Sequence, residues 1–244
     1  FKSFELCLAS SNESKKYLER LKAKNVKYLG NLKLTHENIL NKSNSDNGIQ
    51  KDKKYWCALS THQGEDIFCL NTHLKIKKVH DDVITILIPR HIDRVQSIKS
   101  TCDQLNLKNQ VLSEGELIKG NNEIIIINSY GFTSNYLNLC KSVFIGKSLL
   151  KKFKKVGGQN PIEAAKIGCK IYHGPFVYNF QEIYELLNKY NISETIENES
   201  ELSNKLISDL NKTNETNSEK IEIINGLGKE ILENTFKEIS NVIR

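Results

Sequence analysis

Three short segments of the chain could bind an anion or a nucleotide, because each stands where an apolar run ends. In Ser60-Thr61-His62, hydroxyls and backbone N–H groups at a turn could face an anion. In Pro89-Arg90, a guanidinium held beside a proline could grip a phosphate with two hydrogen bonds. In Tyr130-Gly131-Phe132, the glycine would admit a ligand close to the backbone, and the rings could flank a base.

Each segment also has an ordinary structural explanation. Ser60 or Thr61 could simply cap the following helix. Arg90 could pair with Asp93 or Glu65, and the third segment could be a plain turn between a strand and a helix. None of the three segments therefore decides the function alone.

A fourth segment, Gly157-Gly158-Gln159-Asn160-Pro161-Ile162-Glu163, carries more information. Asn160 suits a helix N-cap, Pro161 the first helical position, and Glu163 the carboxylate position of a capping box. A cap does not explain the two glycines, which would open the helix N-terminus to a ligand. Glu163 could also accept two hydrogen bonds from a ribose diol. The segment therefore indicates nucleotide binding.

A repeated alternation of strands and helices would position these segments. Strands are expected at residues 4–9, 26–29, 55–60, 83–88, around 111, 123–128, 143–145 and 170–172. Helices are expected at 13–23, 65–77, 92–105, from about 133, 161–167, 180–190, 199–210 and about 219–243. Residues 41–54 are polar and indicate a linker or loop. Uniformly apolar strands predict a doubly wound α/β fold with a parallel sheet, whose ligands bind at the carboxyl ends of the strands.

The composition excludes several classes of protein. The 244 residues are 39% hydrophobic and 26% charged, unlike collagen, coiled coils or wholly disordered chains. No apolar run approaches the ~18 residues of a membrane span. The net charge of +6 lies mainly in residues 1–34 and in a lysine cluster from Lys147 to Lys155. These lysines could simply form solvated helix and loop faces, which is the default interpretation, or they could attract an anion. With only four arginines, nucleic acid is not an expected partner.

The cysteines and the missing methionine carry two further expectations. Six scattered cysteines with no CxxC spacing predict neither a zinc site nor a disulfide framework, so no metal is expected. The chain contains no methionine and begins at Phe1 within an apolar pattern. We interpret the sequence as a piece of a longer polypeptide.

The order of the motifs resembles the 3-deoxy-D-manno-octulosonic acid (Kdo) transferases, which are glycosyltransferases of the GT-B fold. The resemblance covers residues 1 to about 235. The matching segments, in order, are Gly30-Asn31-Leu32-Lys33, Ser60-Thr61-His62-x-Gly64-Glu65, Pro89-Arg90-His91, the turn at Gly131, Phe144-Ile145-Gly146-x-Ser148-Leu149, Gly157-Gly158-x-Asn160-Pro161-x-Glu163-Ala164, and Gly174-Pro175 with Asn179-Phe180. The chain departs from the family where Lys147 replaces a glycine and Gln159 stands at a common histidine position.

The resemblance implies transfer of Kdo from CMP-Kdo to a lipid A precursor, without a metal or cofactor. Lys33 would stabilise charge in the transition state. The residues implied to bind CMP are Pro89, Arg90, Tyr130, Gly131, Phe132, Asn160, Pro161, Ile162 and Glu163. Those that would support the donor site are Ser60, Thr61, His62, Gly157 and Gly158.

The resemblance also implies a division into domains. Residues 1–34 would be the last βα piece of an acceptor domain and the interdomain junction, and residues 35–244 the nucleotide-sugar domain with C-terminal helices. The catalytic glutamate and the membrane anchor would lie upstream of Phe1, and the enzyme would work on the cytoplasmic face of the bacterial inner membrane. Two alternatives stay open: another GT-B enzyme that uses a UDP-sugar, and a nucleotide-binding module without catalysis.

Overall fold

The computed structural model describes residues 1–35, 48–50, 52–131, 133–212 and 218–243, which form two compact units. One unit holds the described parts of Phe1–Ile39 and Ser218–Arg244, and the other those of Leu40–Asn217. The last helix therefore groups with the amino-terminal residues. The predicted domain boundary after residue 34 stays a prediction, and most of the predicted linker at 41–54 lies outside the described residues.

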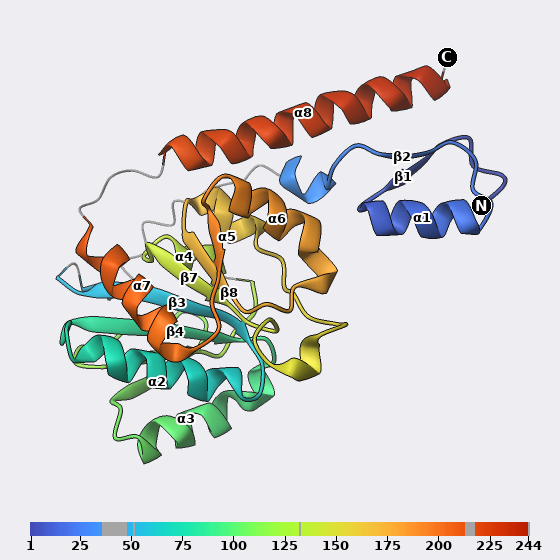
Figure 1. Ribbon diagram of the computed structural model, residues 1–244. Coiled ribbons are helices and arrows are strands. Elements are labelled where there is room, and N and C mark those ends of the chain that lie inside the picture. Colours follow the sequence, from blue (N-terminus) through green and yellow to red (C-terminus); the bar gives the residue numbers. More distant parts are fainter. Residues whose placement is uncertain (36–47, 51, 132, 213–217, 244) are drawn as a thin grey trace. The chain divides into compact units, whose positions relative to one another are not determined.

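The larger unit is built on a seven-stranded sheet in which every pairing is parallel (Figure 1). Its spatial order is β5-β6-β4-β3-β7-β8-β9. The strands are β3 (Lys54–Thr61), β4 (Val83–Pro89), β5 (Asn109–Leu112), β6 (Ile124–Ile127), β7 (Ser142–Ile145), β8 (Lys170–His173) and β9 (Ser193–Thr195). Every residue of β4, β6 and β7 is buried, as expected of strands covered on both faces.

Helices cover both faces of this sheet, which confirms the doubly wound α/β fold (Figure 1). They are α2 (Glu65–Lys77), α3 (Val95–Gln104), α4 (Thr133–Leu137), α5 (Ile162–Ile167), α6 (Gln181–Lys189) and α7 (Glu199–Asn211). Short 3₁₀ turns are η2 (Ile92–Arg94), η3 (Lys151–Phe153) and η4 (Tyr178–Phe180). Helix α3 shows how the sequence dictates the packing, because its buried Val95, Ile98 and Cys102 recur at helical spacing on one face.

The strand order reverses at β3. Leu59, near the end of β3, pairs with Ile88 of β4 on one side and Ile145 of β7 on the other. The chain runs outward from β3 through β4 and later returns to β7. Open α/β sheets bind ligands at such a reversal, outside the carboxyl ends of the strands.

The smaller unit contains a two-stranded parallel sheet, β1 (Cys7–Ala9) and β2 (Val26–Tyr28), with α1 (Asn12–Arg20) packed on it. Helix α1 begins where Ser11 Oγ accepts a hydrogen bond from Ser14 N. The 3₁₀ turn η1 (Leu32–Thr35) packs on α8 (Ser218–Ile243), where Gly228 lies close enough to Leu34 O that a Cβ would collide with it. Among the described residues, no helix is long and apolar enough to cross a membrane.

Candidate nucleotide-sugar site

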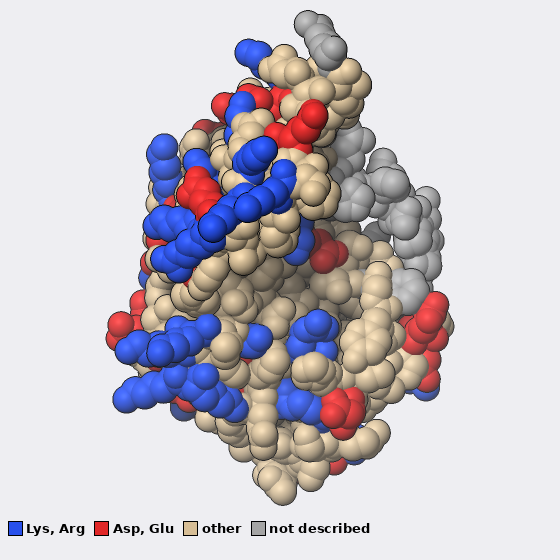
Figure 2. All heavy atoms as spheres, turned by 90° about the vertical axis from the view of Figure 1, so that its right-hand side faces the viewer, with Lys and Arg blue, Asp and Glu red and all other residues tan. Residues whose placement is uncertain are grey.

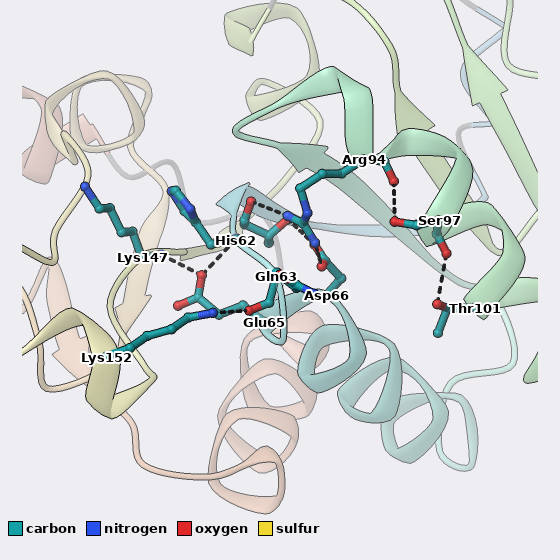
Figure 3. Close-up of polar contacts among 10 residues, drawn as sticks. His62, Gln63, Glu65, Asp66, Arg94, Ser97, Thr101, Lys147 and Lys152 are labelled. Carbon is teal, nitrogen blue, oxygen red and sulfur yellow. Dashed lines mark hydrogen bonds and ion pairs between the residues drawn. The ribbon is translucent and has the colours of Figure 1, made fainter.

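The buried carboxylate of Glu65 joins the loops that follow β3 and β7. Its Oε2 accepts hydrogen bonds from His62 N at 3.0 Å and Lys147 N at 2.6 Å. Its Oε1 accepts from Ser148 N at 2.9 Å and Leu149 N at 3.1 Å. Because four backbone N–H groups from both loops meet one carboxylate, the two loops are fixed to each other at the strand-order reversal. Figure 3 shows the contacts of Glu65 with His62 and Lys147.

The segment after β3 is shaped by an irregular backbone. Ser60 has φ +53° at a register shift between Leu59 and Thr61, and Thr61 Oγ1 donates to Asp66 Oδ1 at 2.7 Å. Helix α2 begins after Gly64, so the capping alternative for Ser60 or Thr61 is wrong. The Thr61 side chain bonds to Asp66, and the N-cap position of α2 is held by Gly64.

His62 lies at the centre of a group of basic side chains. Its ring makes edge contacts with His91 and Phe153, with centroids 5.6 and 5.4 Å apart, and Gln159 Nε2 lies 3.4 Å from its Nε2. Burial, together with the charges of Lys147, His91, Arg94 and Arg90, lowers the pKa of His62 to about 4. His62 is therefore neutral near pH 7.

The two arginines after β4 have different surroundings. Arg94 forms an ion pair with Asp66 and donates from Nη1 to Thr61 O at 3.1 Å (Figure 3). Arg90 is exposed and forms no ion pair with any described residue, so its predicted alternative pairing with Asp93 or Glu65 is absent there. Arg94 therefore stabilises the fold by holding Asp66 and Thr61, a role that the sequence did not indicate. Arg90 remains available to a ligand.

The turn after β6 is only partly described. Gly131 has φ +93°, a conformation that favours glycine, and the neighbouring Tyr130 is 58% exposed. Phe132 lies outside the described residues. The base contacts predicted for this turn stay a prediction.

The glycine pair before α5 has a packing reason. A Cβ on Gly157 would lie 2.2 Å from Phe176 O, and one on Gly158 would lie 3.0 Å from Val177 O. Gly157 N donates to Phe153 O and Gly158 N to Lys147 O, both at 2.7 Å. Both N–H groups are used within the chain, so the glycines fit loop packing rather than an open helix terminus.

At the start of α5, the carboxylate of Glu163 has no hydrogen-bond partner among the described residues. Asn160 Oδ1 accepts from Ile162 N at 3.1 Å, and Pro161 occupies the N-cap position. Glu163 is half-buried, accepts no hydrogen bond from a described residue, and has its pKa raised by burial. Among the described residues, the capping box is therefore not formed and Glu163 is available for a hydroxyl ligand.

Basic side chains gather in groups on the face shown in Figure 2. In the larger unit, the cluster that follows β7 contributes Lys151, Lys152, Lys154 and Lys155, all exposed. Lys152 Nζ donates to Gln63 O at 2.9 Å, which ties this cluster to the loop after β3 (Figure 3). The resulting field favours an anionic ligand.

A cavity of about 280 Å³ lies beyond β8 and β9, and the sequence did not indicate it. His173 and Thr195 contribute from the strand ends, and Phe176, Tyr178 and Tyr184 add aromatic walls. None of the predicted CMP residues lines it. Lys33 belongs to the other unit, on η1, so its predicted role is not tested by the geometry of this site.

Together, the seven-stranded parallel sheet and the helices on both of its faces define a doubly wound α/β fold that matches the C-terminal domains of GT-B proteins. No family model matches the sequence. Its sequence is nevertheless similar to those of proteins named 3-deoxy-D-manno-octulosonic acid transferase, at 26–29% identity.

Three curated relatives carry the name 3-deoxy-D-manno-octulosonic acid transferase. The Haemophilus influenzae protein is 29% identical over 67% of this chain and 37% of its own length. The Aquifex aeolicus protein is 26% identical over 84% of this chain and 54% of its own length. The Rickettsia prowazekii protein is 28% identical over 87% of this chain and 46% of its own length. The chain thus spans about half the length of these relatives, or less.

Two solved structures are similar in fold. The C-terminal CMP-Kdo binding domain of WaaA from Acinetobacter baumannii has a TM-score of 0.61 at 21% identity, covering 75% of this chain and 90% of that domain. Anabaena HepE in complex with UDP and glucose has a TM-score of 0.57 at 14% identity, covering 97% of this chain and 63% of that protein. At these identities the likeness establishes the fold alone.

Proposed function

We propose that the chain binds CMP-Kdo and supplies the donor half of an enzyme that transfers Kdo to a lipid A precursor. The observation that carries the proposal is a pair of unengaged charged groups at the carboxyl side of the sheet. The Arg90 guanidinium follows β4 and forms no ion pair with a described residue, and the Glu163 carboxylate at the start of α5 accepts no hydrogen bond there. The names of the relatives support the identity of the donor.

The two groups suit opposite ends of a nucleoside monophosphate. A guanidinium offers paired donors to phosphate oxygens, and a carboxylate accepts from the two hydroxyls of a ribose. In the reaction, an acceptor oxygen forms a bond to the anomeric carbon of Kdo while the bond from that carbon to the phosphate oxygen breaks. The proton of the acceptor passes to a base, and CMP leaves. Arg90 would stabilise the charge on the departing phosphate.

Two parts of the proposal concern residues outside the sheet unit. Lys33 would stabilise charge in the transition state, and the acceptor and the membrane surface would be bound by a domain joined to this one. The similarity to relatives named 3-deoxy-D-manno-octulosonic acid transferase supports both parts. The domain division at residues 34 and 35 belongs to the same proposal.

Calorimetry with CMP, UMP and cytidine tests the donor assignment. We expect CMP to bind well above UMP, since the relatives are named for Kdo transfer while other GT-B proteins of similar fold bind UDP. Arg90→Ala should weaken CMP by about 10- to 100-fold, because a charge-assisted contact is lost, and should leave cytidine nearly unchanged. Equal binding of CMP and UMP would favour a UDP-sugar enzyme, and no binding of either would refute the proposal.

A further inference from the structure

Lys147 has a backbone that is fixed at both ends of the residue. Its N–H donates to Glu65 Oε2 at 2.6 Å, and its carbonyl accepts from Gly158 N at 2.7 Å. Its φ of +55° lies in the left-handed region, which costs a lysine about 1–2 kcal/mol and a glycine almost nothing.

The side chain of Lys147 extends beside His62, at the reversal between β3 and β7 (Figure 3). It is part-buried, and its ammonium forms no ion pair with a described residue. The neighbouring cations differ in this respect, since Arg94 is paired with Asp66 and Lys152 donates to Gln63 O. Lys147 therefore brings to the site an ammonium that has no ion-pair partner among the described residues.

The charge of Lys147 acts at the centre of the site. It lowers the pKa of His62, as do the charges of His91, Arg94 and Arg90. Glu65 forms no ion pair with this ammonium, and its carboxylate accepts hydrogen bonds from four backbone N–H groups. An anion placed against His62 would meet several cations at once.

Lys147 and Arg90 stand on opposite sides of β3. They follow β7 and β4, which are the two neighbours of β3, so their backbones are separated by about two inter-strand spacings, roughly 10 Å. Two cations at this separation can bracket two anionic groups that lie next to each other in one ligand. In the CMP ester of an ulosonic acid, the anomeric carbon carries both the phosphate ester and the carboxylate.

From this arrangement we infer that Lys147, assisted by the imidazole of His62, binds the carboxylate of the donor sugar, while Arg90 binds its phosphate. This inference rests on the proposed function and assigns a sugar-acid contact to a residue that replaces a glycine. It makes Lys147 a specificity residue for an acidic sugar over a neutral one.

The test compares the affinities of CMP-Kdo and CMP, measured by calorimetry on the 244-residue chain. Lys147→Gly should reduce the ratio of the two affinities by about tenfold or more, because a charge-assisted contact to the sugar is lost while the phosphate contact stays. Folding should not suffer, because glycine adopts φ +55° without strain. Lys147→Arg should retain most of the ratio.

Lys155→Ala is the matched control, because it removes one exposed lysine of the same cluster. It should leave the ratio unchanged. If Lys147→Gly also leaves the ratio unchanged, or weakens CMP and CMP-Kdo equally, the carboxylate assignment is overturned. If the unaltered chain binds no CMP, the proposed function fails first.

Discussion

Glu163 shows how one side chain can decide between two explanations of a motif. In a capping box, its carboxylate would accept from the backbone N–H of Asn160, but no described residue donates to it. Burial instead raises the pKa of Glu163. A part-buried carboxylate without a donor is costly unless a ligand supplies one, which is the case that ribose binding predicts.

Glu163→Gln should lower CMP affinity several-fold and leave the melting temperature almost unchanged. A glutamine accepts fewer hydrogen bonds from a ribose diol than a carboxylate does, and no cap bond within the described residues is lost. Calorimetry and thermal unfolding measure the two effects. Glu199→Gln, in the first turn of α7, serves as the control and should change neither. A lower melting temperature with unchanged CMP affinity would instead identify Glu163 as a cap.

At the scale of elements, Glu65 joins α2 to the loops after β3 and β7. Removal of the Glu65 carboxylate, which is fully buried, would leave four backbone N–H groups without their acceptor. Glu65→Ala should therefore lower the free energy of unfolding by at least about 3 kcal/mol, as measured by urea denaturation. Glu116→Ala removes one exposed bond to Ser113 N and should cost less than about 1 kcal/mol. Equal losses in the two variants would contradict the role of Glu65.

Two buried histidines make the sheet unit sensitive to acid. Burial lowers the pKa of His73 on α2 and of His173 on β8, each to about 4. Between pH 6.5 and pH 4, these histidines bind protons in the unfolded chain but not in the folded chain. The free energy of unfolding is therefore unaffected by them above pH 6.5, and it falls as the pH decreases from 6.5 through 4. The full loss is on the order of 3 kcal/mol for each histidine.

Urea denaturation at pH 7 and pH 4.5 measures this dependence. The free energy of unfolding should fall between the two values in the unaltered chain. His73→Gln and His173→Gln should each show a smaller fall, because glutamine does not bind a proton in this range. An identical fall in both variants and the unaltered chain would assign the acid sensitivity to other groups.

Elements could be predicted from the sequence where the residues themselves carry the information. The apolar runs of β3, β4, β6 and β7 indicated buried parallel strands, and α2 was predicted with its observed bounds. β9 was missed, because its three residues Ser193–Thr195 are polar at one edge of the sheet. Contacts between segments distant in the sequence could not be predicted. Nothing near Arg94 shows that it meets Asp66, and nothing near Gly157 shows that Phe176 O approaches it.

At the scale of the whole molecule, the question is whether these residues suffice for transfer. The acceptor hydroxyl must lose its proton as it attacks, and a positioned base contributes about 10²–10⁴-fold to the rate. Glu65 cannot serve, since four N–H groups occupy its carboxylate, and Glu163 is proposed to bind ribose. The chain also spans only 37–54% of the three relatives' lengths.

We therefore expect the 244-residue chain to bind CMP-Kdo but to transfer no Kdo to a lipid A precursor. Joining it to the amino-terminal part of the Aquifex aeolicus relative should restore transfer, because that part would supply the base and the acceptor site. In the joined protein, Lys33→Ala should lower kcat more than donor affinity if Lys33 acts mainly in the transition state. Transfer assays with radiolabelled Kdo check each step. Rapid transfer by the 244 residues unaided would show that the base lies within them and would overturn the division into donor and acceptor halves.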